Sequence, residues 1–407
     1  MSAKKRIFIA IQYLEIGGAE RSLIGLLNAI DYSKFDVDLF VYKHTGEFLK
    51  LVPDQVRLLP ENKRYAALSQ PISEIVRRGY VDLALARLFA RIPARRFEHR
   101  TGVKESIAIY QYVADYTTPL LPSLSKYGVY DLAISFLIPH NIVRDKVVAK
   151  RKLAWIHTDY SFVDVDTNDE LPVWDAYDHV VSISPDVTKG FLGKFPSLAG
   201  KIIQIENILS ESFVRQQAKE GLEEVEKEIG SLCDRAGGEM IRLCSVGRFS
   251  YPKAFDRAVY ICKTMIDHGY SILWYIVGYG GDEPLIQKAI NDTGMQRRFV
   301  LVGKKENPYP YIQSCDIYVQ PSRYEGNAVT VREAQILCKP CVITSYATAN
   351  SQIHDKVDGV IVENDVEGAA DGIEEFINNK ALQVSIIDYL SCHHYGNEQE
   401  ARKLEEL

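Results

Sequence analysis

The fold is decided by the stretch RIFIAIQYLEIGGAERSLIGLLNAIDYSKFDVDLFVY, which occupies residues 6–42. It begins and ends with short apolar runs, RIFIAI at 6–11 and DVDLFVY at 36–42. Such runs are typical of strands buried on both faces of a parallel sheet. Apolar residues between them recur at helical spacing: Leu23, Leu26, Leu27 and Ile30. The stretch therefore predicts a strand, a helix and a second, parallel strand.

The same alternation of apolar runs and helical patterns continues along the chain. Further strands are expected at 131–136, 152–157, 179–184, 241–247, 271–278, 298–303, 316–322 and 340–344. Two groups of alternating strands and helices predict an α/β protein with two Rossmann-like, doubly wound domains. We place the first domain at 1–206, the second at 207–380, and a helical tail at 381–407.

The segment between the two expected domains is acidic. Residues 220–239 carry seven Asp/Glu against two Lys/Arg. We expect a linker near 206–212, followed by a solvated acidic helix that opens the second domain.

Overall composition excludes several classes of protein. The chain has 407 residues and a formal net charge of −6, which argues against nucleic acid as the main partner. No apolar run approaches the roughly 20 residues that a membrane span needs. Gln12 and Glu15 interrupt the first apolar run, so the start of the chain resembles a strand and turn more than a signal peptide.

The seven cysteines are scattered and odd in number, which indicates unpaired thiols in a reducing, cytoplasmic compartment. Cys338 and Cys341 form a single CxxC. A redox pair or half a metal site is one interpretation, and a helix end meeting a strand is the other. Because no second CxxC exists to complete four ligands, we favour the helix end and expect no metal site.

Charged residues follow the first strand expected in the second domain. SVGRFSYPKAFDRAV, residues 245–259, places Arg248 and Lys253 between that strand and a helix. Ligands of open α/β sheets bind beyond the carboxyl ends of the strands. A guanidinium and an ammonium there suit a diphosphate, although two solvated basic residues would give the same pattern.

Glycines follow the next two strands. YIVGYGGDEPLIQKA, residues 275–289, places Gly278 in a strand-to-helix turn, where a ligand could approach the backbone closely. This is not a complete GxGxxG, because Glu283 stands at its last position, so ordinary turn chemistry explains it equally well. In LVGKKENPYPYI, residues 301–312, a nucleobase could lie against the backbone at Gly303 and Lys304.

Two carboxylates stand in SRYEGNAVTVREAQ, residues 322–335. Glu325, Gly326 and Asn327 form a turn at the expected start of a helix, where free N–H groups favour an anion. Glu333 lies two helical turns further on. One carboxylate could reach a sugar ring and the other the paired hydroxyls of a ribose. The alternative is a helix-capping glutamate followed by a surface glutamate.

Taken together, these motifs resemble a known family. The pattern S-x-x-E-G-x-x-x-x-x-x-E-A, preceded by VGR-x-x-x-x-K and VGxG, is similar to that of retaining GT-B glycosyltransferases of family GT4. The segment YEGNAVTVREAQIL, residues 324–337, resembles the corresponding segment of bacterial members that synthesise capsular polysaccharides and exopolysaccharides. The likeness covers nearly the whole chain, since IGGAERSL, AWIHTDYS, VVSISPDV and IENILSES also fit.

The resemblance implies two Rossmann-like domains facing a cleft, with a C-terminal helix that crosses back to the N-terminal domain. It implies a nucleotide-sugar donor, with a UDP-sugar as the default, and a saccharide or lipid-linked saccharide acceptor. It further implies retention of the anomeric configuration and no need for a metal or other cofactor.

The resemblance also assigns roles to single residues. Arg248 and Lys253 would hold the diphosphate, Glu325 would contact the donor sugar, and Glu333 would bind the ribose. The backbone amides of Gly326 and Asn327 would lie near the sugar. The remaining assignments concern the first domain: Gly17 and Gly18 would let a loop approach the phosphates, and His157, oriented by Asp159, would line the sugar pocket. One departure is Ala254, where many members have glycine.

The mechanism follows from the charges that develop. Breaking the anomeric C–O bond leaves negative charge on the diphosphate, which Arg248 and Lys253 would stabilise. Retention needs either a carboxylate nucleophile, for which Glu325 is the candidate, or attack by the acceptor on the same face. We favour same-face attack. Other interpretations are a sugar-nucleotide epimerase, a phosphorylase, a non-catalytic GT-B partner subunit or, least well supported, an NAD oxidoreductase.

Residues 77–104 carry eight Lys/Arg and two Asp/Glu. Arginines recur every fourth residue at Arg87, Arg91 and Arg95, and Pro93 could kink or end a helix there. The apolar stripe consists of Val81, Leu85, Leu88, Phe89 and Ile92. A basic amphipathic segment can bind an anionic bilayer, so we expect peripheral contact with the inner face of the cell membrane. An ordinary solvated domain helix is the alternative.

Overall fold

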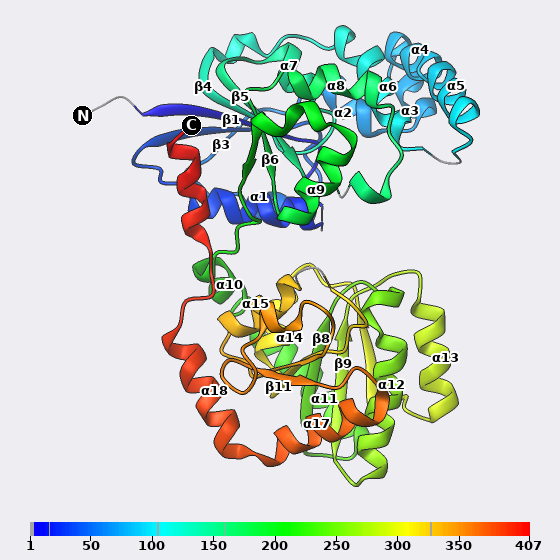
Figure 1. The fold of residues 1–407 in the computed structure, drawn as a ribbon, viewed down its shortest axis with the longest axis vertical. Coiled ribbons are helices and arrows are strands. Elements are labelled where there is room, and N and C mark those ends of the chain that lie inside the picture. The colour runs from blue at the N-terminus through cyan, green and yellow to red at the C-terminus, as the bar shows by residue number, and fades with distance from the viewer. Residues whose placement is uncertain (1–3, 16, 104–105, 159, 326–327) are drawn as a thin grey trace. The chain divides into compact units, whose positions relative to one another are not determined.

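The computed structural model describes residues 4–15, 17–103, 106–158, 160–325 and 328–407 (Figure 1). The chain divides into two compact units. Unit 1 contains Met1–Ile208 and Asn397–Leu407, and unit 2 contains Leu209–Gly396. The chain therefore passes from unit 1 to unit 2 after residue 208 and returns to unit 1 after residue 396.

Unit 1 is built on a seven-stranded parallel sheet with the order β3-β2-β1-β4-β5-β6-β7. Its strands are β1 (Lys5–Ile11), β2 (Phe35–Val41), β3 (Arg57–Leu58), β4 (Val129–Ser135), β5 (Val148–Ile156), β6 (His179–Ser182) and β7 (Ile202–Gln204). The chain starts in the middle of the sheet and winds first towards β3 and then towards β7. The expected doubly wound sheet is confirmed, and only the two short edge strands, β3 and β7, were not expected.

The opening stretch folds as β1, helix α1 (Gly18–Ala29) and β2. Ile7 pairs with Val37 of β2 and with Leu132 of β4, so β1 is hydrogen-bonded on both sides. The helix turns Leu23, Leu26 and Leu27 into the core. A Cβ on Gly25 would lie 2.0 Å from the carbonyl oxygen of Ile208, so this glycine allows the chain leaving unit 1 to pass directly over α1.

The other helices of unit 1 are α2 (Lys63–Ala66), α3 (Ile72–Arg77), α4 (Val81–Phe89), α5 (Arg91–Thr101), α6 (Ala108–Thr117), α7 (Asn141–Lys146), α8 (Thr167–Asp175) and α9 (Pro185–Lys194). Short 3-10 helices are η1 (Glu47–Leu51), η2 (Ala67–Ser69), η3 (Thr118–Leu120), η4 (Ser125–Tyr127), η5 (Tyr160–Phe162) and η6 (Pro196–Lys201). Figure 1 shows α3, α4, α5 and α6 grouped together. The break between α4 and α5 lies at Ala90, and Pro93 is accommodated in the first turn of α5.

Unit 2 is built on a six-stranded parallel sheet with the order β10-β9-β8-β11-β12-β13. Its strands are β8 (Ile241–Val246), β9 (Ile272–Val277), β10 (Phe299–Gly303), β11 (Ile317–Gln320), β12 (Cys341–Thr344) and β13 (Val360–Val362). Its helices are α10 (Glu211–Gln217), α11 (Leu222–Ala236), α12 (Phe255–Asp267), α13 (Glu283–Thr293), α14 (Tyr309–Gln313), α15 (Val329–Ile336), α16 (Ala349–Gln352), α17 (Val366–Asn378) and α18 (Lys380–Cys392), with the 3-10 helix η7 (Tyr251–Lys253) after β8.

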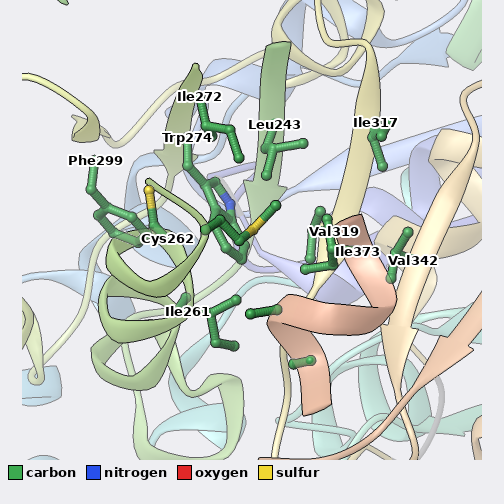
Figure 2. Close-up of a cluster of buried hydrophobic side chains, with 14 of the residues drawn as sticks. Leu243, Ile261, Cys262, Ile272, Trp274, Phe299, Ile317, Val319, Val342 and Ile373 are labelled. Atoms are coloured by element: carbon green, nitrogen blue, oxygen red, sulfur yellow. The ribbon is translucent and has the colours of Figure 1, made fainter. Parts of the chain in front are cut away.

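Helices cover both faces of the second sheet. Figure 2 shows Leu243, Trp274 and Val319 from three strands packed against Ile261 of α12 and Ile373 of α17. Successive strand residues point to opposite faces, so the neighbouring Tyr275 and Tyr318 pack on the other side with α11, α14 and α15. The sheet is therefore fixed on both sides, and its strand ends form a rigid edge.

The segments before and after this sheet complete unit 2. Helix α11 buries Val225, Ile229 and Leu232 and exposes its glutamates, so the solvated acidic helix is present. Helix α18 packs on unit 2 through Ile386 and Leu390. The last residues form the 3-10 helix η8 (Glu398–Glu405), which belongs to unit 1.

The CxxC lies where helix α15 gives way to strand β12. The helix ends at Ile336 and the strand begins at Cys341, and both cysteines are free thiols. The helix-end interpretation is therefore confirmed.

Candidate functional site

The expected motifs of unit 2 all follow the carboxyl ends of strands. Arg248 and Lys253 follow β8, Gly278 follows β9, Gly303 ends β10, and Glu325 follows β11. In a parallel sheet these ends meet at one edge. Because β8 pairs with both β9 and β11, the loops at the centre of this edge are neighbours.

Lys253 and Glu325 form an ion pair at this edge. Lys253 Nζ lies 2.5 Å from Glu325 Oε1. The same oxygen accepts hydrogen bonds from Ser322 Oγ at 2.6 Å and from Gln320 Nε2 at 3.1 Å. The Lys253 side chain is 20% exposed and that of Glu325 is 10% exposed. The carboxylate is thus largely desolvated and compensated by three donors.

Further hydrogen bonds hold Glu325 and its partner Gln320 in place. Gln320 Oε1 accepts a hydrogen bond from Tyr318 Oη at 2.8 Å, which fixes the amide. Thr348 Oγ1 donates to the backbone oxygen of Glu325 at 2.8 Å. Sequence reasoning missed Gln320, Ser322 and Thr348. The signal for the first two was the polar pair beside Pro321 at the end of a strand, whereas Thr348 is brought in only by the fold.

Arg248 differs from Lys253 in having no compensating acid. Its side chain is exposed and has no ion-pair or hydrogen-bond partner in the part of the chain that the structure describes. Nearby Arg323, in contrast, donates to Asp256 at 2.7 Å. Arg248 is therefore a cation at the strand edge that is available to an anionic ligand.

The glycines of this edge have different explanations. A Cβ on Gly278 would lie 1.9 Å from the carbonyl oxygen of Gly247, and one on Gly280 would lie 2.3 Å from that of Phe249. These two glycines are therefore explained by close packing of neighbouring turns. Gly303 has a φ of +84° and open space around its Cα, which suits a turn beside a ligand. Lys304 Nζ lies 5.3 Å from the ring centroid of Tyr279.

Glu333 is fully buried on α15, with 0% of its surface exposed. Its Oε1 accepts a hydrogen bond from Tyr309 Oη at 2.9 Å. The alternative of a surface glutamate is therefore wrong. The capping alternative for Glu325 is also wrong, because Ala328 is the N-cap of α15 and no side chain caps it. Gly326 and Asn327 lie outside the described residues, and ribose binding by Glu333 stays a prediction.

The expected residues of unit 1 lie at the carboxyl edge of its own sheet. Gly17 is the N-cap of α1 and Gly18 is its first residue. A Cβ on Gly18 would meet nothing within 4 Å, so the helix start is open there. Nearby Glu20 is buried, and this burial raises its pKa.

His157 follows β5 and packs against aromatic rings. Its ring lies parallel to that of Trp155 and 4.7 Å from that of Phe136. Burial lowers the pKa of His157 to about 3, so the imidazole is neutral. Asp159, expected to orient it, lies outside the described residues.

Comparisons with known proteins agree with this geometry. A family model described as glycosyl transferases group 1 matches residues 236–390, the segment that contains every motif of the second sheet. The poly(ribitol-phosphate) alpha-N-acetylglucosaminyltransferase of Staphylococcus aureus strain COL is 26% identical over 139 residues. The capsular polysaccharide biosynthesis glycosyltransferase CapM of S. aureus is 26% identical over 143 residues. The matches cover 34% and 35% of this chain but only 28% and 38% of those proteins.

Solved structures match along nearly the whole chain. A glycosyltransferase from Rickettsia africae ESF-5 aligns over 99% of this chain and 97% of its own, with a TM-score of 0.63 at 15% identity. The Anabaena protein Alr3699/HepE, solved with UDP-glucose, aligns over 99% of this chain and 100% of its own, with a TM-score of 0.60 at 14% identity. At such identities the likeness concerns the fold, and the expected GT-B fold is confirmed.

Proposed function

Since residues 236–390 form a glycosyl transferases group 1 domain within a chain of the GT-B fold, we propose that this protein is a retaining glycosyltransferase. It moves a sugar from a nucleotide-sugar donor, with a UDP-sugar as the default, to a saccharide or lipid-linked saccharide. The observation that carries this proposal is the Lys253–Glu325 pair, together with Arg248 at the same strand edge of unit 2, whose side chain has no partner among the described residues.

Charge complementarity supports the donor side of this proposal. The diphosphate of a donor would take Arg248 as a bidentate partner and would compete with Glu325 for Lys253. Both cations would then stabilise the negative charge that grows on the leaving group. Because these side chains supply positive charge themselves, we propose that no metal ion is required.

The hydrogen bonds of Glu325 favour same-face attack by the acceptor. Glu325 Oε1 accepts from three donors, which makes this one oxygen a poor nucleophile. These donors fix the orientation of the carboxylate, which would stabilise the positive charge on the sugar ring. In our proposal the leaving phosphate takes the proton of the acceptor hydroxyl.

The surface of α4 and α5 supports contact with a bilayer on the cytoplasmic side. Five apolar side chains, which we call the α4–α5 apolar face, are 44% to 54% exposed: Val81, Leu85, Leu88, Phe89 and Ile92. The surrounding segment 77–104 has a formal charge of +6, from eight basic and two acidic residues. Apolar side chains within a basic segment suit an anionic lipid surface. Among the described helices, none is long and apolar enough to cross a bilayer.

A donor screen tests the proposed reaction. The purified full chain is incubated with a panel of sugar nucleotides, with and without a chelator, and release of the nucleotide is measured. We expect at least one sugar nucleotide to be hydrolysed slowly, with an unchanged rate in chelator and an α-anomer as first product from an α-linked donor. Glu325→Gln should lower this rate without unfolding the protein. Absence of both turnover and binding across the panel would refute the enzyme proposal.

Product analysis without an acceptor separates the other activities. An epimerase would return a second sugar nucleotide, and a phosphorylase would need inorganic phosphate. A non-catalytic partner subunit would bind the nucleotide without any turnover.

A further inference from the structure

The loop that joins β8 to α12 contains a strained backbone conformation directly after Lys253. Ala254 has a φ of +55° and a ψ of +31°, which lies in the left-handed region. A residue with a Cβ disfavours this region by a factor of about 5 to 30, whereas glycine adopts it readily. Ala254 is both the C-cap of η7 and the N-cap of α12, so its conformation sets the direction of η7 relative to the helix.

Arg323, in the loop that follows β11, holds η7 in this conformation from outside. Its Nη1 donates to the backbone oxygen of Tyr251 at 2.7 Å, and its Cζ lies 4.3 Å from the centroid of the Tyr251 ring. The backbone N–H of Arg323 donates to the backbone oxygen of Pro252 at 2.7 Å. One residue from a neighbouring strand end therefore binds η7 through its side chain and through its backbone.

Asp256 fixes the orientation of this guanidinium. It lies in the first turn of α12, and its Oδ1 and Oδ2 accept from Nη1 and Nη2 of Arg323 at 2.9 and 2.7 Å. Burial opposes ionisation of Asp256, but the hydrogen bonds and the charge of Arg323 outweigh it and lower the pKa of this carboxyl. The pair is thus a forked, charge-assisted contact. Because Tyr251 precedes Ala254 and Asp256 follows it, Arg323 connects both sides of the strained residue. We call Arg323, Asp256 and Tyr251 the Arg323 clamp.

The Arg323 clamp also determines where the ammonium of Lys253 lies. Lys253 is the last residue of η7, and its Nζ lies 2.5 Å from Glu325 Oε1. Glu325 follows Arg323 in the same loop, so this loop supplies both the carboxylate that pairs with the lysine and the arginine that holds the backbone beside it. If Ala254 relaxed to a negative φ, η7 would point in another direction and the ammonium would leave this position.

We propose that Arg323 is a positioning residue: through Tyr251 and Asp256 it offsets the strain at Ala254, and it thereby keeps Lys253 where a donor diphosphate would meet it. Glycine at position 254 would adopt the same conformation without a clamp. The clamp therefore explains how this chain accommodates alanine at a position where many members of the resembling family have glycine. The diphosphate rests on the proposed transferase function, whereas the clamp itself rests on the contacts within unit 2.

Hydrogen exchange of the full chain without ligand, followed by mass spectrometry, tests the clamp itself. The peptide 248–256 contains the backbone N–H of Ala254, which donates to the backbone oxygen of Tyr251 at 3.3 Å. We expect Arg323→Gln to raise the exchange rate of this peptide about tenfold, because the strain is no longer offset. Adding Ala254→Gly should restore exchange to within about threefold of the rate in Ala254→Gly alone. Unchanged exchange in Arg323→Gln, or no restoration by glycine, would refute the clamp.

Calorimetry with UDP and uridine connects the clamp to the diphosphate. Arg323→Gln should weaken UDP binding about tenfold and leave uridine binding unchanged, because only the phosphate contact of Lys253 is lost. Arg323→Lys keeps the charge without the fork and should recover part of the affinity, and Ala254→Gly combined with Arg323→Gln should recover most of it. The Ala254 methyl group is buried, so stability is measured separately. A lower melting temperature with unchanged UDP affinity in Arg323→Gln would give this arginine a structural role alone and overturn the positioning role.

Arg242→Gln is the matched control. Arg242 forms a similar forked pair with Asp316, through Nε at 3.2 Å and Nη2 at 2.7 Å, at the opposite end of β8. Its loss should change neither exchange of the peptide 248–256 nor UDP affinity, and an equal loss of UDP affinity in both variants would overturn the positioning role. If wild type binds no UDP while exchange follows the prediction, the proposed transferase function fails and the clamp stands. If wild type and Arg323→Gln bind UDP equally, the positioning role fails alone.

Discussion

At the scale of single residues, the site depends on contacts between segments that are distant in the sequence. The spacing of Glu325 and Glu333 could be read directly from the sequence. The ion pair between Lys253 and Glu325 joins residues 72 positions apart, and it exists because β8 and β11 are neighbours in the sheet. Strand order is a property of the whole sheet, so no local pattern predicted this pair.

Arg248 offers the most direct test of diphosphate binding. A hydrogen bond to a charged group contributes about 1.5–3 kcal/mol, so Arg248→Gln should weaken UDP binding about ten- to a hundredfold. Uridine, which has no phosphate, should bind as before. Calorimetry with uridine, UMP and UDP measures this. The control is Arg242→Gln at the opposite end of β8, where the arginine pairs with Asp316 at 2.7 Å. Equal weakening of all three ligands would exclude a phosphate contact.

Glu333 has to be tested for stability and binding together, because it is completely buried. If it binds the ribose, Glu333→Gln should weaken UDP binding about ten- to a hundredfold. Tyr309→Phe removes the hydrogen bond to Glu333 Oε1 and serves as the control for a purely structural role. We expect both variants to lower the melting temperature and only Glu333→Gln to lower UDP affinity. Unchanged UDP affinity in Glu333→Gln would leave this residue with a structural role alone.

The neutral histidines of unit 1 predict a loss of stability at acid pH. The pKa values of His140 and His157 fall from 6.5 to about 3 on folding, so the unfolded chain binds more protons below pH 6.5. Stability is therefore complete above that pH and decreases as the pH falls towards 3. The slope is about 1.4 kcal/mol per pH unit for each histidine.

A substitution distinguishes the contribution of the histidines to the pH dependence of stability from that of the carboxyl groups in the same unit. In denaturant unfolding of unit 1 between about pH 6.5 and pH 5, His140→Gln should show a smaller pH slope, by about 0.7 kcal/mol per unit at pH 6.5 and about 1.3 kcal/mol per unit at pH 5. His268→Gln, at an exposed position of unit 2, should leave the slope of unit 1 unchanged. An identical slope in wild type and His140→Gln would contradict the prediction.

At the scale of helices and strands, the length of a strand determined whether the sequence predicted it. The ten expected strands were recognised as apolar runs, whereas β3, β7 and β13 have only two or three residues each. A strand of two or three residues is defined by its pairing with the neighbouring strand. It is too short to show a periodic pattern in the sequence. The break at Ala90 was likewise unmarked, since alanine favours a continuous helix and Pro93 suggested a later break.

The α4–α5 apolar face predicts how the protein binds vesicles. Leu85→Ser combined with Phe89→Ser removes two side chains that are 48% and 54% exposed, so folding should be little affected. Burial of such side chains is worth about 1.5–3 kcal/mol each when complete, so partial insertion of both predicts at least a thirtyfold loss of vesicle affinity. Co-sedimentation with anionic vesicles measures this.

The matched control for vesicle binding is Leu285→Ser, because Leu285 is 50% exposed on α13 of unit 2. Binding should also weaken between 0.1 M and 1 M salt, where the Debye length falls from about 10 Å to about 3 Å. Equal sedimentation of the double variant and of wild type would remove this face as the membrane contact. Arg87 is half-buried and donates to the backbone oxygen of Gln70, so it contributes little to the outer surface.

At the scale of the whole molecule, the two-domain organisation followed from alternating strands and helices. What the pattern could not show was the division of the C-terminal segment between the two units. Helix α18 supplies Ile386 and Leu390 to the core of unit 2, whereas η8 buries Ala401 and Leu404 in unit 1. A helical repeat identifies an apolar face but does not identify the surface that it will meet.

Residues 397–407 make unit 2 an insertion within unit 1. The ends of this insertion are already joined, since Asn397 Nδ2 donates to the backbone oxygen of Asn207 at 3.1 Å and the backbone N–H of Glu206 donates to Glu400 Oε2 at 3.1 Å. Unit 1 should therefore survive excision of residues 209–396 if residue 208 is spliced to residue 397 through a short glycine linker. A chain simply truncated after residue 208 would expose the surface that Leu404 covers, and it should lose about 2 kcal/mol or more of stability relative to the spliced chain. Comparing the two by denaturant unfolding would show whether the chain can be divided into its two units, and only the splice should yield a unit 1 that folds by itself.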